Sequence, residues 1–356
     1  MCTVAVTGGA GFLGQHVIQH LQLSAPWVTE IRVFDLIPFS RSLDYTPRLD
    51  VITYTGNLGD TESLRKAFHN ASAVLHLASA IDARFQPDKK LLQEVNVKGT
   101  ANVIAACVEE GVPILIYCSS IGTVQGYFNC QGGSETELKD VRPLLFRDYG
   151  GTKRVAEQQV LKADQTPLAN GKKLRTVSLL PPTMYGEGDK LIAMMLQYAE
   201  DNNGSFIRMG NGENLEAYAY AGNVAWGFVC CLKTMYNNPS FGNERMFIMD
   251  DTPPQSIQAL SRPYLESRGF QMTSYYVPLS IVFCICFLVE TVCLLISPFK
   301  RFSFPLSLSG IIFSTRKFYV RYDKAKTLIG YVPPFSVEGA RERSLPYYNN
   351  VKLRKN

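Results

Sequence analysis

Charged side chains are scarce in this chain of 356 residues. Asp, Glu, Lys and Arg make up 19% of it, 46% of the residues are hydrophobic, and the net charge is only +5. The basic residues form no dense run before the last few residues, so a nucleic-acid partner is not expected. A charge-poor composition of this kind indicates an apolar surface or contact with a membrane.

The sequence also lacks the cysteine and histidine spacings of metal centres. Its nine cysteines form no CxxC pair, which favours reduced cysteines over a disulfide framework or a structural zinc site. His16 and His20 have an i, i+4 spacing that could hold a metal ion. Because no carboxylate or cysteine accompanies them, we expect these histidines on the surface of a helix and no bound metal.

Short β-branched segments alternate with helical patterns through the first half of the chain. TVAVTG at 3–8 leads into the helical pattern FLGQHVIQHLQ, EIRVFDL at 30–36 has the pattern of a second strand, and the alternation continues to LRTVSLL at 174–180. Apolar strands that alternate with helices predict an α/β fold with a doubly wound parallel sheet of the Rossmann type. The less regular remainder predicts a smaller lobe folded over the sheet.

A glycine-rich turn, TGGAGFLG, follows the first predicted strand and opens the first helix. Its spacing reads as GxxGxxG or as GxGxxG. Glycines here let the backbone approach a pyrophosphate, which binds to free amides at the positive end of the helix. The strand before and the helix after make this a dinucleotide-binding motif. The residues expected to contact the cofactor are Gly8, Gly9, Ala10, Gly11, Phe12, Leu13 and Gly14.

Asp35, at the end of the second predicted strand, indicates which dinucleotide binds. A carboxylate about 20 residues after the glycines accepts hydrogen bonds from the adenosine ribose and repels a 2′-phosphate, so NAD is favoured over NADP. Asn57 and Leu58 are candidate adenine contacts, although ordinary turn chemistry explains them equally well. Ala78 is small enough to let the backbone pass close to the cofactor, and Pro181 completes the predicted cofactor-binding set.

Ser120, Tyr149 and Lys153 are the candidate catalytic residues. Ser120 follows the fifth predicted strand, at the sheet edge where parallel α/β folds bind ligands. Tyr149 and Lys153 lie one turn apart on the same face of a helix. A phenol with an ordinary pKa of about 10 is a poor base near neutrality, and we expect the neighbouring ammonium, with the positive nicotinamide ring, to lower that pKa. Asn96 is a further candidate, which could position a water for proton relay.

Together these residues predict oxidation of an alcohol. Tyr149 would take the proton of the substrate hydroxyl, Ser120 would orient the hydroxyl oxygen, and a hydride would pass to NAD. Lys153 would also hold the nicotinamide ribose. Gly150 and Gly151 lie between the tyrosine and the lysine. Each costs about 1 kcal/mol relative to Ala inside a helix, so we expect them to loosen the geometry of the pair.

These motifs together resemble the extended short-chain dehydrogenase/reductase family. They are TGGAGFLG, Asp35, NVKGT, YCSS and the Tyr–Lys pair. Within that family, YGEGD, GNVAWGFV, DDTPPQS and the late apolar segment are similar to the 3β-hydroxysteroid dehydrogenase/Δ5–Δ4 isomerases. The resemblance implies NAD-dependent oxidation of a 3β-hydroxysteroid, followed by migration of a ring double bond. Asp250, Asp251 or Tyr149 could serve as the acid/base group of the second step, and the acidic pair could equally cap a turn.

Three alternatives stay open. A sterol-4α-carboxylate 3-dehydrogenase would oxidise the same carbon and let a neighbouring carboxylate leave as carbon dioxide, and GNGENL at 210–215 favours it slightly. A nucleotide-sugar epimerase is less favoured, because it has no use for a long apolar segment. A catalytically silent NAD(H)-binding adaptor is disfavoured by the intact serine, tyrosine and lysine.

The apolar segment Val277–Ile296 carries a single charge, Glu290. Its length matches the hydrocarbon core of a bilayer. Residues typical of membrane interfaces flank it: Tyr275, Tyr276, Lys300 and Arg301. Because the chain that follows resembles the closing part of the family's substrate lobe, we expect insertion from one face, as a monotopic or re-entrant anchor. The expected location is the endoplasmic reticulum membrane with the catalytic lobe in the cytosol, and a mitochondrial membrane is the alternative.

The predicted organisation has five parts. They are an NAD-binding Rossmann domain at 1–185, a substrate lobe at 186–274, a membrane-associating segment at 275–300, a return segment packing on the substrate lobe at 301–345, and a flexible tail at 346–356. The expected partners are NAD, a steroid or sterol substrate and membrane lipid. A second copy of the chain is a further candidate partner, as a homodimer.

Overall fold

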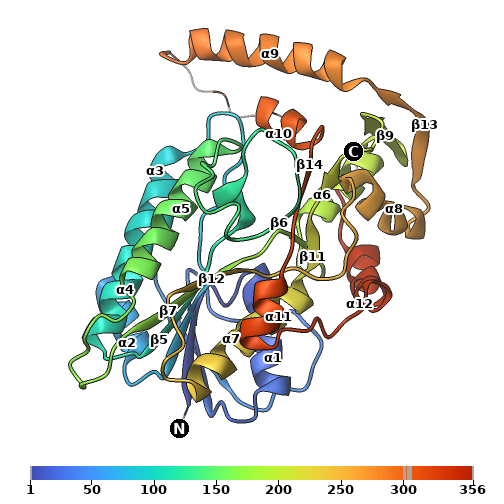
Figure 1. Ribbon diagram of the computed structural model, residues 1–356. Coiled ribbons are helices and arrows are strands. Elements are labelled where there is room, and N and C mark those ends of the chain that lie inside the picture. Colours follow the sequence, from blue (N-terminus) through green and yellow to red (C-terminus); the bar gives the residue numbers. More distant parts are fainter. Residues whose placement is uncertain (1, 300–301, 303–306, 355–356) are drawn as a thin grey trace.

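A computed structural model describes residues 2–299, 302 and 307–354 of the chain. Within these residues, parallel strands form a central seven-stranded sheet (Figure 1). Their spatial order is β12 (Glu244–Phe247), β7 (Arg175–Leu180), β5 (Ile114–Cys118), β4 (Ala73–His76), β1 (Thr3–Thr7), β2 (Glu30–Asp35) and β3 (Val51–Thr55). The order runs outward in both directions from β1 and β4, which confirms the predicted doubly wound Rossmann sheet.

Helices cover both faces of this sheet. They are α1 (Phe12–Ser24) and α7 (Ala221–Asn237) on one face, and α2 (Thr61–Phe68), α4 (Gly99–Glu109) and α5 (Arg147–Lys162) on the other. Every residue of β1, β4 and β5 is buried, as expected for strands covered on both sides. Alternate residues serve opposite faces, since Val4 and Val6 pack with α1 and α7 whereas Ala5 packs with the other three helices.

A smaller lobe lies on the right in Figure 1. Its elements are α6 (Leu191–Asp201), α8 (Ile257–Ser267), α12 (Val337–Asn350), the strand pair β8 (Thr183–Tyr185) and β11 (Tyr218–Tyr220), and the pair β9 (Ser205–Met209) and β13 (Gln271–Val277). The three helices share an apolar core to which Leu196, Tyr264 and Tyr348 belong. This core is separate from the two that flank the central sheet.

The boundary predicted at residue 185 does not separate the two parts in space. Helix α7 and strand β12 come later in the chain, yet α7 packs against α1 and β12 is an edge strand of the central sheet, paired with β7. The reason lies in their apolar residues. Val224, Phe228 and Phe247, for example, are fully buried in the core of the sheet. The segment 186–274 therefore contributes to the Rossmann layers as well as to the smaller lobe.

The predicted flexible tail at 346–356 is wrong for the residues that the structure describes. Helix α12 continues to Asn350, and the Tyr348 side chain is fully buried. Its hydroxyl donates to Asp189 Oδ2 at 3.0 Å and accepts from the Gly186 amide at 2.9 Å. The Arg354 amide bonds Gln197 Oε1 at 2.8 Å. Residues 355 and 356, like the predicted anchors Lys300 and Arg301, lie outside the described residues.

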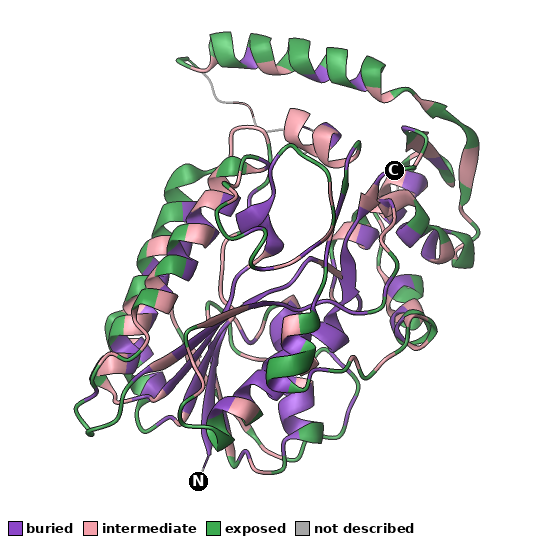
Figure 2. Cartoon of the chain, viewed as in Figure 1, coloured by how far each residue is buried: buried purple, intermediate pink, exposed green. Residues whose placement is uncertain are grey.

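The apolar segment forms helix α9 (Leu279–Ile296) at the periphery of the molecule, largely exposed along its length (Figure 2). Among the described residues it is the one helix long and apolar enough to cross a membrane, with a mean hydropathy of 2.7 and only 17% of its residues buried. Its buried stripe, Val282 and Cys286, contacts Ile311 of α10 (Leu308–Phe313). Its one charge also faces inward, since Glu290 Oε1 accepts from the Leu308 amide at 2.8 Å.

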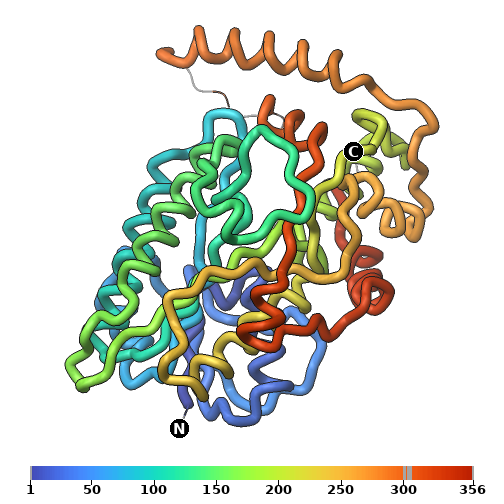
Figure 3. The backbone as a smooth tube through the Cα atoms, viewed as in Figure 1, coloured from blue at the N-terminus to red at the C-terminus, as the bar shows by residue number. Residues whose placement is uncertain are grey.

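The chain returns from α9 into the body of the protein, as Figure 3 traces through α10 and into β14 (Lys317–Val320). Strand β14 lies between β10 (Leu215–Glu216) and β6 (Cys130–Gly133), and α11 (Asp323–Ile329) then packs on α7 and β12. Buried Arg316, just before β14, bonds Glu216 Oε1 at 2.8 Å and the Gly126 carbonyl at 2.7 Å. The chain on the two sides of α9 therefore belongs to one folded body.

We predict that Tyr348→Ala lowers the free energy of unfolding by about 3–5 kcal/mol, because it removes a buried aromatic ring from the core of the smaller lobe. Urea denaturation followed by fluorescence measures this. The control is Val332→Ala at an exposed position, which we expect to change stability by less than about 0.5 kcal/mol. Equal stability of the two variants would mean that the tail does not pack as described.

Candidate active site

In the glycine-rich turn, side chains in place of the glycines would clash with neighbouring backbone atoms. Gly8 has a φ of +73°, and a Cβ there would lie 2.6 Å from the Ala78 amide nitrogen. A Cβ at Gly14 would lie 2.3 Å from the Gly8 carbonyl oxygen. Among the described residues, no side chain caps the N-terminus of α1, so its first amides remain available to an anion. The close pass at Ala78 agrees with its predicted role beside the cofactor.

Asp35 lies beside this turn, as a ribose-binding carboxylate would. Its Oδ2 accepts from the Ala10 amide at 2.9 Å and its Oδ1 from the Leu36 amide at 2.7 Å. The nearest cation on the same strand is directed elsewhere, since Arg32 bonds Glu30 and the Ala67 carbonyl. Free amides, a glycine cradle and an acidic strand end therefore fit NAD, and they offer little to hold a 2′-phosphate.

The other predicted cofactor contacts have mixed outcomes. The exposed Asn57 uses Oδ1 to accept from the Gly59 amide at 2.8 Å, which is turn chemistry. The Leu58 side chain is buried in the core, and its contact with adenine stays a prediction. The Pro181 carbonyl accepts from the Ile121 amide at 3.0 Å, which joins the end of β7 to the turn after β5.

Ser120, Tyr149 and Lys153 come together at the carboxyl end of β5. Ser120 precedes the short 3-10 helix η2 (Ile121–Val124), and its Oγ accepts from the Gly122 amide at 3.0 Å. Lys153 is fully buried, and its Nζ donates to the Cys118 carbonyl at 2.6 Å. Tyr149 lies in the first turn of α5, where its phenol meets the Ser120 side chain. Helix α5 thus brings the predicted pair against the strand end that carries the serine.

Gly150 has a packing role that its helix propensity does not reveal. A Cβ at this position would lie 2.6 Å from the Gly122 carbonyl oxygen and 3.0 Å from Pro143 Cβ. The glycine therefore permits the close contact between α5 and η2. A Cβ at Gly151 would meet nothing within 4 Å. The expected loosening is thus wrong for Gly150, which allows a tighter contact at the site. Gly151 lowers helix stability without allowing any such contact.

Burial determines the electrostatics of the pair. It raises the pKa of Tyr149, and the nearby Cys118 thiol adds to this, whereas a hydrogen bond with Ser120 favours the phenolate. Burial also lowers the pKa of Lys153 to about 8. Lys153 is not among the groups that shift this pKa, and its ammonium bonds the Cys118 carbonyl. The lowering expected from lysine and nicotinamide together stays a prediction.

Asn96 is buried in a π-helical turn, η1 (Gln93–Lys98), which follows the short helix α3 (Lys89–Leu92). Its Oδ1 accepts from the Ala80 amide at 2.8 Å, and its Nδ2 donates to the Ala80 carbonyl at 3.0 Å and to Thr152 Oγ1 at 3.1 Å. The side chain therefore ties the segment after β4 to α5. Its role in positioning a relay water stays a prediction.

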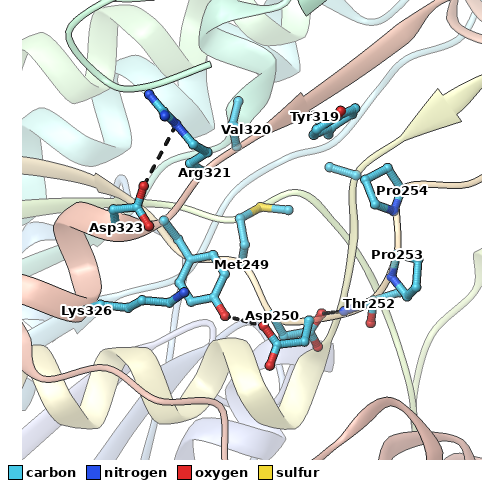
Figure 4. A pocket seen from close by; sticks show the side chains of 13 residues that line it. Met249, Asp250, Thr252, Pro253, Pro254, Tyr319, Val320, Arg321, Asp323 and Lys326 are labelled. Carbon is cyan, nitrogen blue, oxygen red and sulfur yellow. Dashed lines mark hydrogen bonds and ion pairs between the residues drawn. The ribbon is translucent and has the colours of Figure 1, made fainter. Parts of the chain in front are cut away.

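Asp250 and Asp251 take the structural role that was the alternative to acid/base chemistry. Buried Asp250 accepts from the Tyr220 amide and Asn223 Nδ2, both at 2.8 Å, and burial raises its pKa. Asp251 accepts from the Tyr322 hydroxyl at 2.6 Å. The two carboxylates border a surface groove of about 300 Å³ between the segments 249–254 and 319–326 (Figure 4). The candidate catalytic residues Ser120, Tyr149 and Lys153 do not line this groove.

The predicted surface position of the histidine pair is wrong. Both rings are buried, because α1 packs against α7 and the chain at Glu187. His16 Nε2 bonds the Glu187 carbonyl and His20 Nε2 bonds the Gly222 carbonyl, both at 2.9 Å. Burial lowers the pKa of each to about 4, so both are neutral at physiological pH. Within the described residues, no group of three or more His, Cys, Asp or Glu side chains could hold a metal ion.

Two residues at the site, Thr152 and Glu157, were not predicted from the sequence. Thr152 Oγ1 receives the Asn96 bond, and Glu157, one turn after Lys153, accepts from Ser119 Oγ at 3.1 Å. The i, i+4 spacing of Lys153 and Glu157 was a usable signal. Nothing in the sequence pointed to Thr152.

Comparison with known families agrees with this site. The model of the 3-beta hydroxysteroid dehydrogenase/isomerase family matches residues 5–279. The chain belongs to this family. The predicted extended short-chain dehydrogenase/reductase relationship is therefore confirmed.

Solved structures of extended short-chain dehydrogenases/reductases share the fold. MoeE5 in complex with UDP-glucuronic acid and NAD has a TM-score of 0.69 at 21% identity, covering 97% of this chain and 98% of that one. The UDP-glucose 4-epimerase of Thermus thermophilus in complex with NAD has a TM-score of 0.68 at 19% identity, covering 98% and 100%. Epimerase Mth375 from Methanothermobacter thermautotrophicus has 0.71 at 20%, covering 98% and 92%. Family and fold support an NAD-dependent oxidoreductase, as the sequence predicts.

The two glycines between Tyr149 and Lys153 should respond oppositely to an added methyl group. We expect Gly151→Ala to raise the free energy of unfolding by about 0.5–1 kcal/mol, since its Cβ meets open space. Gly150→Ala should destabilise the fold by about 1–3 kcal/mol through overpacking against Gly122 and Pro143. Thermal unfolding of the matched pair decides this. A neutral Gly150→Ala would contradict the close contact between α5 and η2.

Proposed function

We propose that the protein oxidises the 3β-hydroxyl of a steroid to a ketone with NAD and then moves the ring double bond from Δ5 to Δ4. One observation carries the proposal: Ser120, Tyr149 and Lys153 meet beside a glycine cradle in a chain of the 3-beta hydroxysteroid dehydrogenase/isomerase family. Hydroxyl, phenol and ammonium are the groups that alcohol oxidation needs at a nicotinamide.

The protein supplies proton transfer and orientation in this reaction. Bound NAD, held by the residues 8–14 and Asp35, supplies the ring that accepts the hydride of the substrate carbon. Ser120 Oγ orients the substrate hydroxyl, and Tyr149 Oη takes its proton as the carbonyl forms. Because burial raises the pKa of Tyr149, the hydrogen bond from Ser120 and the charge of Lys153 must offset that cost. Tyr149 is also the proposed acid/base of the isomerisation, since backbone and side-chain donors already occupy Asp250.

We also propose that α9 is a monotopic anchor in the endoplasmic reticulum membrane, with the body in the cytosol. The exposed apolar face supports lipid contact. One-sided insertion is supported by the attachments at both ends of the helix, because β13 before it and β14 after it pair with strands of the same body. A single crossing would place those strands on opposite sides of the bilayer. A sterol would enter from the phase in which it dissolves.

Tyr149→Phe should lower kcat for sterol oxidation by about 10²–10⁴-fold, because the proton acceptor is lost. The assay follows NADH and the conjugated-enone absorbance with 3β-hydroxysteroids that carry or lack a 4α-carboxyl group. Tyr236→Phe, at an exposed position, is the matched control. Turnover by Tyr149→Phe at the parental rate would remove the tyrosine from the mechanism.

The substrate panel separates the remaining functions. Enone formation with a 4-unsubstituted Δ5-steroid supports dehydrogenation with isomerisation. Turnover of 4α-carboxysterols alone would indicate the decarboxylating 3-dehydrogenase. NAD binding without NADH formation for any sterol would indicate the silent adaptor.

Introducing two lysines on the exposed face of α9 should weaken binding of the protein to lipid. Leu288 and Leu295 are 64% and 73% exposed, and replacing both with Lys should weaken binding to phosphatidylcholine vesicles by more than about tenfold. Vesicle flotation measures this, with Val332→Lys, at a 69% exposed position on the body, as control.

One-sided insertion is tested separately in sealed microsomes, where protease should digest a C-terminal tag and the N-terminus together. A protected tag beside a digested N-terminus would reject one-sided insertion.

A further inference from the structure

The carboxyl end of β5 is held at three consecutive residues. The Cys118 carbonyl accepts from Lys153 Nζ at 2.6 Å, and Ser120 Oγ accepts from the Gly122 amide at 3.0 Å. The residue between them, Ser119, donates its hydroxyl to Glu157 Oε2 at 3.1 Å. Lys153 and Glu157 are one turn apart on α5, so one face of this helix binds two successive residues of the strand end.

Glu157 is buried, and its charge has two counterparts. Its side chain is 5% exposed, and Oε1 accepts from Arg245 Nε of β12 at 2.7 Å. One turn earlier on the same face of α5 is the fully buried Lys153. Burial disfavours its charged form and lowers its pKa, whereas the Cys118 thiol and then Glu157 favour the charged form. Buried charges cost several kcal/mol unless they are paired and hydrogen-bonded. The order of charges is thus cation, anion, cation: arginine, glutamate, lysine.

The other groups around the Lys153 ammonium supply little negative charge. On β5, the Tyr117 ring centroid lies 4.3 Å from Nζ, and burial raises the pKa of the Cys118 thiol to about 11. On β4, burial and the lysine itself lower the pKa of His76 to about 3, so that ring is neutral. On α5, burial raises the pKa of the Tyr149 phenol. The carboxylate of Glu157, which forms an ion pair with Arg245, is therefore the negative group on the face of α5 that carries Lys153.

We propose that Glu157 is a positioning residue for the reaction, which fixes the strand end through Ser119 and provides the negative charge that the buried ammonium of Lys153 requires. The inference rests on the proposed function, because it assigns Glu157 a role through the catalytic lysine and serine. Arg245 moderates the effect, because its positive charge offsets part of the negative charge of Glu157.

The test follows the ionisation of Lys153 in the full-length protein without cofactor or steroid. Lysine is labelled with ¹³C at Cε, and the Lys153 resonance is identified by its absence in Lys153→Arg. The chemical shift of this resonance is followed against pH, and in the parent protein the midpoint of the titration should lie near pH 8. Glu157→Gln should lower that midpoint by about 1 pH unit, because an adjacent anion is lost. Arg245→Met should raise it, because the glutamate is then less neutralised.

Ser119→Ala is the matched control, since it removes the hydrogen bond to Glu157 and leaves every charge in place. Its midpoint should stay at the parental value. Opposite shifts in Glu157→Gln and Arg245→Met support the proposal, and a merely structural role would not produce them. An unchanged midpoint in Glu157→Gln, or shifts of the same sign in both charge variants, would overturn it. A parent enzyme inactive on every sterol would reject the proposed function and leave these titration results in place.

Discussion

The contact between the first turns of α5 and the end of β5 is the constraint on which the site depends. A fully buried lysine needs a hydrogen-bond acceptor, and here Lys153 bonds the carbonyl of Cys118 at 2.6 Å. The helix can come close enough only because Gly150 has no side chain where the Gly122 carbonyl lies. If the helix moved away, the ammonium of Lys153 would lose its hydrogen bond, and if it moved closer, Gly150 would clash with the Gly122 carbonyl. The positions of phenol, ammonium and serine hydroxyl are therefore linked.

Polar side chains hold the surroundings of this contact by bonding backbone groups. Asn96 ties the segment after β4 to α5 through Ala80 and Thr152, and Asp250 ties the smaller lobe to the start of α7. Each is a residue type that can do chemistry, yet its hydrogen-bonding atoms are occupied by neighbours in the fold. The distinction between catalytic and positioning residues thus depends on which bonds the side chain has already made.

The sequence predicts much of this arrangement, and its failures share a cause. Strand–helix alternation and the glycine spacing are local patterns, and they predict the sheet and the dinucleotide cradle correctly. The burial of His16 and His20 depends on α7 and the chain at Glu187, far along the sequence, and an i, i+4 spacing looks the same on a covered or an exposed face. The raised pKa of Tyr149 and the place of β12 at the sheet edge likewise arise from contacts between distant segments. Tyr348 lies in a polar stretch whose composition does not reveal its burial.

Strand β14 has a consequence for biosynthesis. It pairs with β6 and β10, and Arg316 beside it reaches the carbonyl of Gly126 and the carboxylate of Glu216, all encoded far upstream. During translation, the first half of the chain leaves the ribosome while this neighbour is still missing. Until the return strand is synthesised, β6 after Ser120 lacks its pairing strand and Glu216 lacks its counter-ion. The apolar helix is synthesised before that strand, so its exposed apolar face emerges before the body of the protein can close.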